Sequence, residues 1–214
     1  MRRRVSTLKC RALESNASLP FNSFAFGLAW VALLPACQNA DDIIQAARFD
    51  DLNKLRDCVE AGIPVDHADP AGETALFHIV GLGSDEGFQL LLDHGADVRL
   101  RDGSGNTLLH KAITFEQNSL ALKLIDRGVD VSATNKVGAT ALHYAVRAGN
   151  QAMVELLLSK GADIEVKDSA GSTPVEIAHA MSGRQNLSDT MGRKISSKQM
   201  NKIMSALTKL TTNK

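Results

Sequence analysis

The segment Gly138-Ala-Thr-Ala-Leu-His143 indicates the fold, because variants of it recur at a fixed interval along the chain. Each copy opens with Gly-x-Thr, and the copies begin at Gly72, Gly105, Gly138 and Gly171, 33 residues apart. A second glycine series has the same spacing and comprises Gly62, Gly95, Gly128 and Gly161. Two registers that agree over four units indicate an internal repeat, and a period of this length indicates a stack of small units.

Each unit is predicted to be a pair of short helices. Thr140 can cap the first helix through its hydroxyl, and Ala141, or Pro174 in the last unit, begins it. Apolar residues at helical spacing follow in both helices, namely Leu142, Ala145 and Val146, then Val154, Leu157 and Leu158. Gly149 and Gly161 stand where the two helices must end. A unit of this size cannot close its own core, so neighbouring units must stack.

The Gly-x-Thr-x-Leu-His segments and the Gly-Ala-Asp-Val segments resemble those of ankyrin repeat proteins over residues 41–181. The resemblance implies an all-α repeat solenoid, an ankyrin stack of about four to five helix-turn-helix units with short β-hairpin turns. It also implies that His110 and His143 form hydrogen bonds near the turn of their units. Phe77 and Glu176 occupy this position in the first full unit and the last unit, so the hydrogen bonds there must differ.

The repeat divides the chain into segments. Residues 41–67 form a helix pair without a hairpin and are predicted to cap the N-terminal end, followed by repeats at 68–100, 101–133, 134–166 and 167–181. In the last unit, polar residues interrupt the chain where the second helix is due. That helix is predicted to resume at Ser196 or Ser197, within a basic C-terminal capping segment, 182–214.

The N-terminus is predicted to be an export signal. Three arginines precede an uncharged apolar run from Phe24 to Leu34, which is too short for a spanning helix and of the right length for a signal peptide. Leu34-Pro-Ala-Cys37 resembles the signal of bacterial lipoproteins, which implies a signal peptide at 1–36, lipidation of Cys37 and a lipidated linker at 37–40. Ordinary cleavage after Ala36 and burial of the apolar run in the fold are the alternatives. Gln38 after the cysteine favours, by the same resemblance, an outer-membrane lipoprotein facing the periplasm, with the soluble periplasm as the alternative.

The cysteines fit this interpretation. Loss of the leader removes Cys10 and acylation occupies Cys37, so Cys58 is expected to remain alone as a small buried residue of an apolar helix face. No disulfide is predicted.

The charges are segregated along the chain. Residues 1–36 carry five basic residues and one acidic residue, and residues 182–214 carry seven and one, whereas residues 38–181 carry 12 and 22. An acidic body repels polyphosphates, so nucleic acid is not expected as a partner. It points instead to a basic protein of the envelope or a basic secreted protein.

No catalytic, cofactor or metal site is predicted, and no small-molecule substrate. His110 and His143 are one repeat apart in equivalent places, and the other histidines lack Cys or acidic partners at ligand spacing. Motifs for phosphate binding and for nucleophilic catalysis are absent from the sequence.

Function is therefore expected on a surface. By resemblance, first helices and hairpin tips line a concave binding face. The predicted partner-binding residues are Phe49, His78, Lys111, Phe115, Tyr144, Arg147, Arg101 and Lys136. For Phe49 and Phe115, partial burial in the packing is an equal alternative. Two roles fit: a lipid-tethered adaptor that occludes or scaffolds a partner, such as an immunity or stress-enzyme-associated factor, and a non-tethered periplasmic or cytosolic assembly adaptor.

Overall fold

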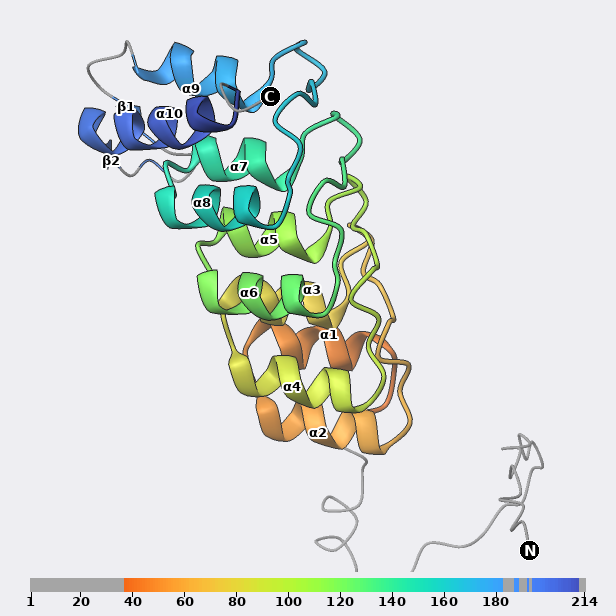
Figure 1. The fold of residues 1–214 in the computed structure, drawn as a ribbon. Coiled ribbons are helices and arrows are strands. Elements are labelled where there is room, and N and C mark those ends of the chain that lie inside the picture. The colour runs from red at the N-terminus through yellow and green to blue at the C-terminus, as the bar shows by residue number, and fades with distance from the viewer. Residues whose placement is uncertain (1–36, 183–186, 189–191, 193, 212–214) are drawn as a thin grey trace, which may run out of the picture. The chain divides into compact units, whose positions relative to one another are not determined.

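The computed structural model describes residues 37–182, 187–188, 192 and 194–211, all within one compact unit. The predicted signal peptide, residues 1–36, lies outside the described residues. Helix pairs stack one on the next, and the loops between pairs gather along one side (Figure 1). The helices are α1 (Asp41–Arg48), α2 (Leu52–Glu60), α3 (Ala75–Leu82), α4 (Asp85–Asp93), α5 (Leu108–Thr114), α6 (Asn118–Asp126), α7 (Ala141–Arg147), α8 (Gln151–Ser159), α9 (Pro174–Ser182) and α10 (Ser197–Thr211).

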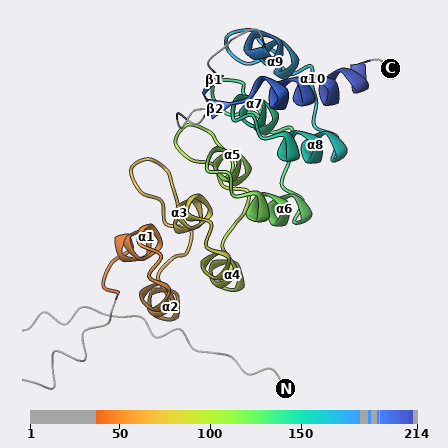
Figure 2. The same ribbon diagram turned by 90° about the vertical axis from the view of Figure 1, so that its left-hand side faces the viewer.

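The helices form two layers. The first helices of the units, α1, α3, α5, α7 and α9, follow one another in one layer, and α2, α4, α6 and α8 follow in the other (Figure 2). A continuous apolar core fills the space between them, with fully buried Leu55, Leu76, Leu109 and Leu142 each supplied by a different unit. The predicted all-α repeat solenoid is confirmed.

The hairpins between units are built by a repeated side-chain turn. Residues 69, 102, 135 and 168 are one period apart, and each side-chain oxygen accepts hydrogen bonds from the backbone N–H groups two and four residues later. Asp and Asn favour this geometry because the short side chain reaches its own backbone. Each of the first three hairpins is closed by a single bridge, Ala68 with Thr74, Arg101 with Thr107 and Thr134 with Thr140.

The motif histidines close the starts of α5 and α7. Thr107 and Thr140 form capping boxes with His110 and His143, whose Nδ1 atoms accept from the threonine N–H groups. The Nε2 atoms face backbone carbonyls of the next unit, at 3.0 Å for His110 and 3.2 Å for His143. Both rings are therefore neutral with the proton on Nε2, and each one ties two units together. Burial lowers the pKa of both histidines from the usual 6.5, more than their carbonyl partners raise it.

Protonation of these histidines should destabilise the stack. Because their pKa values are depressed in the folded state, the unfolded chain binds protons more tightly, so the free energy of unfolding should fall as pH drops below about 6.5 toward the folded pKa values. Urea denaturation at several pH values from 7.5 to 4.5 measures this slope. His110→Gln should flatten it, whereas His179→Gln, at an exposed position, should leave it unchanged. Equal slopes in all three proteins would contradict this assignment.

The starts of α3 and α9 lack the motif histidine and are stabilised in two other ways. Glu176 completes a capping box with Thr173, since its carboxylate accepts from the Thr173 N–H at 2.8 Å and Thr173 Oγ1 accepts from the Glu176 N–H at 3.2 Å. Phe77 forms no such bond and is instead fully buried, and the Thr74 side chain at the start of α3 accepts no capping hydrogen bond.

Cys37 and Cys58 form a disulfide, with their Cα atoms 5.1 Å apart. The prediction that Cys58 stands alone and that no disulfide exists is wrong. The pairing could not be predicted from the order of residues, because the two cysteines are 21 residues apart in the sequence. They meet because α2 packs against the segment that precedes α1. The bridge holds this segment against the N-terminal cap.

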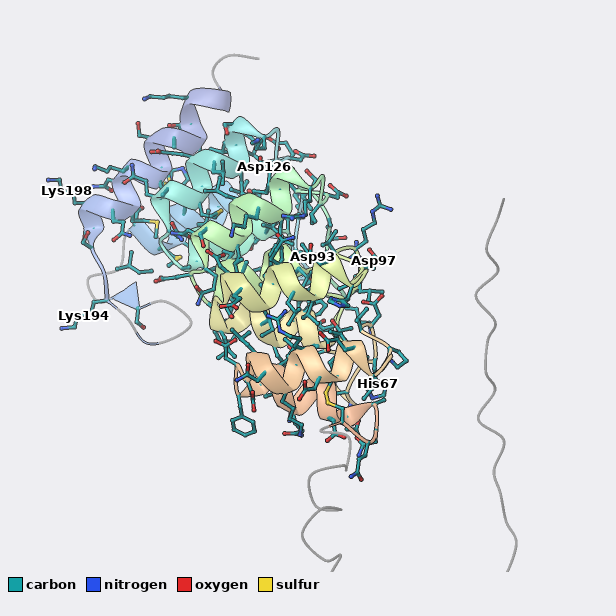
Figure 3. All side chains as sticks on the ribbon, turned by 90° about the horizontal axis from the view of Figure 1, so that it is seen from below. His67, Asp93, Asp97, Asp126, Lys194 and Lys198 are labelled. Carbon is teal, nitrogen blue, oxygen red and sulfur yellow. A yellow bond between two sulfur atoms is a disulfide. The ribbon has the colours of Figure 1, made fainter. Side chains whose placement is uncertain are left out.

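The C-terminal segment returns onto the stack. Strands β1 (Leu187–Ser188) and β2 (Lys194–Ile195), for which the residue pattern gives no signal, pair antiparallel ahead of α10. Ser196 caps α10, and Met200, Ile203 and Leu207 are buried against α8 and α9. Gly149 permits this close packing, because a Cβ there would lie only 2.8 Å from Ile195. Lys194 and Lys198 lie on the opposite side of the molecule from Asp97 and His67 (Figure 3).

The turns after α1, α3, α5 and α7 each contain one residue in the left-handed region. Gly83 and Gly149 fill this position in two units, whereas Asp50 and Glu116 adopt φ values of 52° and 56° in the equivalent places. A side chain in this region is strained, and glycine is not.

Asp50→Gly should therefore stabilise the protein by about 0.5–1 kcal/mol. The neighbouring Asp51 is the matched control, because its side chain caps α2 by accepting from the Lys54 N–H and its φ is −80°. Asp51→Ala should destabilise by about 1 kcal/mol. Urea denaturation decides between these outcomes, and a loss of stability in both variants would disprove the strain at residue 50.

Candidate protein-binding face

The exposed parts of α1, α3, α5, α7 and α9, together with the hairpins, form a surface that we call the first-helix face. The eight predicted partner-binding residues belong to it, because each lies in or directly after a first helix or in a hairpin. Their surroundings separate them into two groups, those bound within the stack and those that lie open.

Arg101 and Lys136 belong to the first group. Arg101 donates to the carbonyl oxygens of Gly105 at 3.0 Å and of Thr134, in the next unit, at 2.7 Å. Lys136 Nζ donates to the Gly103 carbonyl of the preceding unit at 2.6 Å. These side chains are exposed and yet link adjacent hairpins, so they hold the units of the stack together. Repeat numbering alone could not separate this role from partner binding.

Tyr144 and Arg147 are likewise engaged. The Tyr144 hydroxyl accepts from Asn135 Nδ2 at 3.0 Å, and the ring lies edge-on to His110 with a centroid separation of 5.3 Å. Arg147 donates to Asp168 at 2.7 Å. Burial raises the pKa of Asp168, but hydrogen bonds from Ser172 and Ala170 and the charge of Arg147 outweigh it, so this pKa lies below its usual value. Arg48 pairs with Asp69 in the same manner three units earlier.

His78 and Lys111 take part in an ion-pair network beside Arg48. His78 Nε2 lies 3.2 Å from Asp69 and Nδ1 lies 3.6 Å from Glu73. Arg48 pairs with Asp69 at 2.8 Å, and Lys111 pairs with Glu73. Burial and the charge of Arg48 together lower the pKa of His78 by more than Glu73 and Asp69 raise it. The expectation that this histidine has no acidic partner is wrong, because the hairpin brings both carboxylates to its ring.

Asp69, Glu73 and His78 present donor atoms within 4.8 Å of one another, which is close enough to consider a metal site. The geometry argues against one. A single ion can bind only one ring nitrogen, whereas the two carboxylates face opposite nitrogens of His78. Arg48 and Lys111 already neutralise these carboxylates, so a cation would have to displace both. The cluster is an ion-pair network.

Phe49 and Phe115 form the open group. Phe49 follows α1 with 80% of its surface exposed, and Phe115 follows α5 with 37% exposed. The alternative of partial burial in the packing is wrong for Phe49, whereas Phe115 has more than half of its surface covered and is partly buried. Leu82, at the end of α3, is 52% exposed as well.

A shallow hollow of about 160 Å³ lies on the first-helix face, between residues of the ion-pair network and the exposed apolar residues. Its walls are Arg48, His78, Gly81, Leu82, Lys111 and Phe115. Lys111 Nζ lies 5.1 Å from the centre of the Phe115 ring, a cation–π distance. Hence His78, Lys111 and Phe115, three of the predicted residues, meet at one place on the face, and Leu82 and Gly81 join them.

Comparisons with known proteins agree with the fold. A family model described as ankyrin repeats in three copies matches residues 43–135, and one described as ankyrin repeats in many copies matches residues 124–178. Together they cover residues 43–178, more than half of the chain, so the chain belongs to the ankyrin repeat proteins. No curated protein matches the sequence. Ankyrin repeats bind other proteins and are in general not catalytic, and the chain is accordingly a protein-interaction module.

Proposed function

We propose that this chain is an exported protein-binding module of the bacterial envelope, which occludes or scaffolds a partner protein through the first-helix face. The observation that carries the proposal is the exposure of Phe49, Leu82 and Phe115 on consecutive first helices of an ankyrin stack. Aromatic side chains held outside the core are typical anchors of protein interfaces.

The disulfide supports export. Structural disulfides persist in oxidising compartments such as the bacterial periplasm and are rare in the cytosol. Cys37 would be the first residue of the mature chain after cleavage at Ala36, and its pairing with Cys58 would form after translocation. This agrees with the basic and apolar residues of the predicted leader.

The same disulfide bears on the lipid anchor. The Cys37 sulfur cannot be both in the disulfide and acylated through a thioether, so the tethered form would leave Cys58 as a buried thiol. The pairing therefore favours the soluble periplasmic form over the lipid-tethered form. No helix among the described residues is long and apolar enough to cross a membrane.

Intact mass and cell fractionation of the full chain expressed in a bacterium test this assignment. The periplasmic form should begin at Cys37, weigh two thiol hydrogens less than the reduced chain and leave the cells on osmotic shock. Acyl mass and membrane sedimentation that Cys37→Ser abolishes would instead establish the tethered form. An uncleaved cytosolic chain would disprove export.

The binding face is tested by photocrosslinking in intact cells. A photoreactive residue at Phe115, on the first-helix face, should capture a discrete envelope partner, whereas the same residue at Leu122 on α6, 43% exposed, should not. Capture from Leu122 alone would contradict the assigned face. An immunity role predicts one tight partner whose toxicity appears when this chain is deleted, and an assembly role predicts binding without protection.

A further inference from the structure

The exposed apolar residues of the first-helix face follow the period of the repeat. Phe49, Leu82 and Phe115 are separated by 33 residues each and stand at the C-terminal ends of α1, α3 and α5. We call them the apolar ladder. They are three of the five large hydrophobic residues that are exposed in the described part of the chain, the others being Leu122 and Val137. In the next two units the equivalent residues are Ala148 and Met181, which are buried and partly buried, so the ladder is confined to three helices.

Single exposed hydrophobic residues are ordinary, but the three residues of the ladder occupy equivalent positions in consecutive units. Leu82 and Phe115 line the same hollow. Its depth depends on Gly81, because a Cβ there would lie 3.2 Å from the Lys111 side chain and 3.8 Å from the Phe115 ring. Phe49 adjoins Arg48, which lines the same hollow. Leu82 and Phe115 thus provide apolar walls to a hollow that one side chain could fill, and Phe49 is exposed one repeat earlier.

The charges differ on the two sides of the ladder. On the hairpin side, Arg48 and Lys111 are neutralised by Asp69 and Glu73. On the side of the turns between paired helices, Asp50, Asp85 and Glu86 are exposed, and Lys123 pairs with Asp85 at 2.8 Å. The turn side therefore carries net negative charge, which favours an occupant with basic residues along that flank.

The spacing of the ladder selects the shape of the occupant. Neighbouring packed helices lie about 8–10 Å apart, so the three side chains extend over about 16–20 Å. In an α-helix, residues seven apart lie on one face and about 10.5 Å apart along the axis. In an extended strand, residues on one face repeat about every 6.7 Å, which does not match.

We propose that the apolar ladder docks an amphipathic α-helix of a partner protein, which presents apolar side chains at positions i, i+7 and i+14 and Lys or Arg along the flank facing the turns. The middle apolar side chain enters the hollow beside Gly81, and the basic flank meets Asp50 and Glu86. This deepens the proposed function, since it names the kind of segment that the first-helix face takes.

Fluorescence anisotropy with the purified full chain tests the docking. The probe is a fluorescein-labelled helical peptide with Leu at the three positions, Lys on one flank and Ala and Gln elsewhere. A second peptide has Glu in place of each Lys. The Lys peptide should bind, and the Glu peptide should bind at least about tenfold more weakly.

Variants locate the site. The triple variant Phe49→Ser, Leu82→Ser, Phe115→Ser should weaken binding at least about tenfold, whereas the matched double variant Leu122→Ser, Val137→Ser should bind as the wild type does. Gly81→Leu should also weaken binding by filling the hollow. Residue 81 is helical without a positive φ, and the nearest atom to an added Cβ is the flexible end of the Lys111 side chain, which would have to move aside.

Each of the following results would overturn the proposal. One is equal peptide affinity in the wild type and the triple variant, and another is equal affinity for the Lys and Glu peptides. The third is self-association in sedimentation velocity that the triple variant abolishes, because the occupant would then be a second copy. If neither peptide binds while crosslinking from Phe115 still captures an envelope protein, the docking of a helix on the apolar ladder is disproved and the proposed function stands. If crosslinking captures no envelope protein while the Lys peptide binds the wild type and not the triple variant, the envelope role is disproved and the docking of a helix on the ladder stands.

Discussion

Reduction of the Cys37–Cys58 disulfide is expected to lower the free energy of unfolding by about 3 kcal/mol. The bridge closes a loop with a sequence separation of 21, and closing a loop of this size removes that much conformational free energy from the unfolded chain. The loss should concentrate at the N-terminal end, because each unit of a stack contacts only its neighbours. Hydrogen exchange should then show α1 and α2 opening before α5 to α8.

Urea denaturation with and without reductant measures the effect, and a Cys37→Ser, Cys58→Ala double variant serves as the control. The variant should resemble the reduced wild type and should not respond to reductant. Alanine is the suitable replacement at residue 58, because this position is fully buried and a hydroxyl there would need a partner. Two free thiols in the unreduced protein would show that the bridge does not form, and would remove the support that the bridge gives to export.

Phe77→Ala is expected to cost about 3–5 kcal/mol. Phe77 is fully buried and is among the largest side chains in the core, and removal of a buried ring leaves a cavity that the neighbours fill only in part. The first full unit lacks the histidine capping box of the next two units, so packing of this ring stabilises it where hydrogen bonds stabilise its neighbours.

Phe49→Ala is the matched control for that experiment. The same truncation at a ring that is 80% exposed should change the stability by less than about 0.5 kcal/mol. Urea denaturation of both variants provides the comparison. Similar stability losses at the two positions would mean that the burial of residue 77 is wrongly assigned.

The first-helix face could be predicted from the residue pattern, but the role of each of its residues could not. Repeat numbering places Phe49, Phe115, Arg101 and Lys136 on the same face. Only the folded hairpins reveal that Arg101 and Lys136 bind backbone carbonyls of neighbouring units, and only the end of α5 leaves Phe115 outside the core. The spacing of Leu82 from these phenylalanines was available in the sequence, but its exposure was not.

The repeat, the helix pairs, the position of the last helix and the fold class could all be predicted from the residues alone. These follow from local rules, since capping residues, glycines and apolar spacing act within one unit and recur every 33 residues. The tertiary structure alone decided that Cys37 meets Cys58, that His78 meets Asp69 and Glu73, and that Phe77 is buried while Phe115 is not. Each of these depends on how one segment lies against another, and side-chain contacts between units follow from the packing of the stack rather than from spacing along the chain.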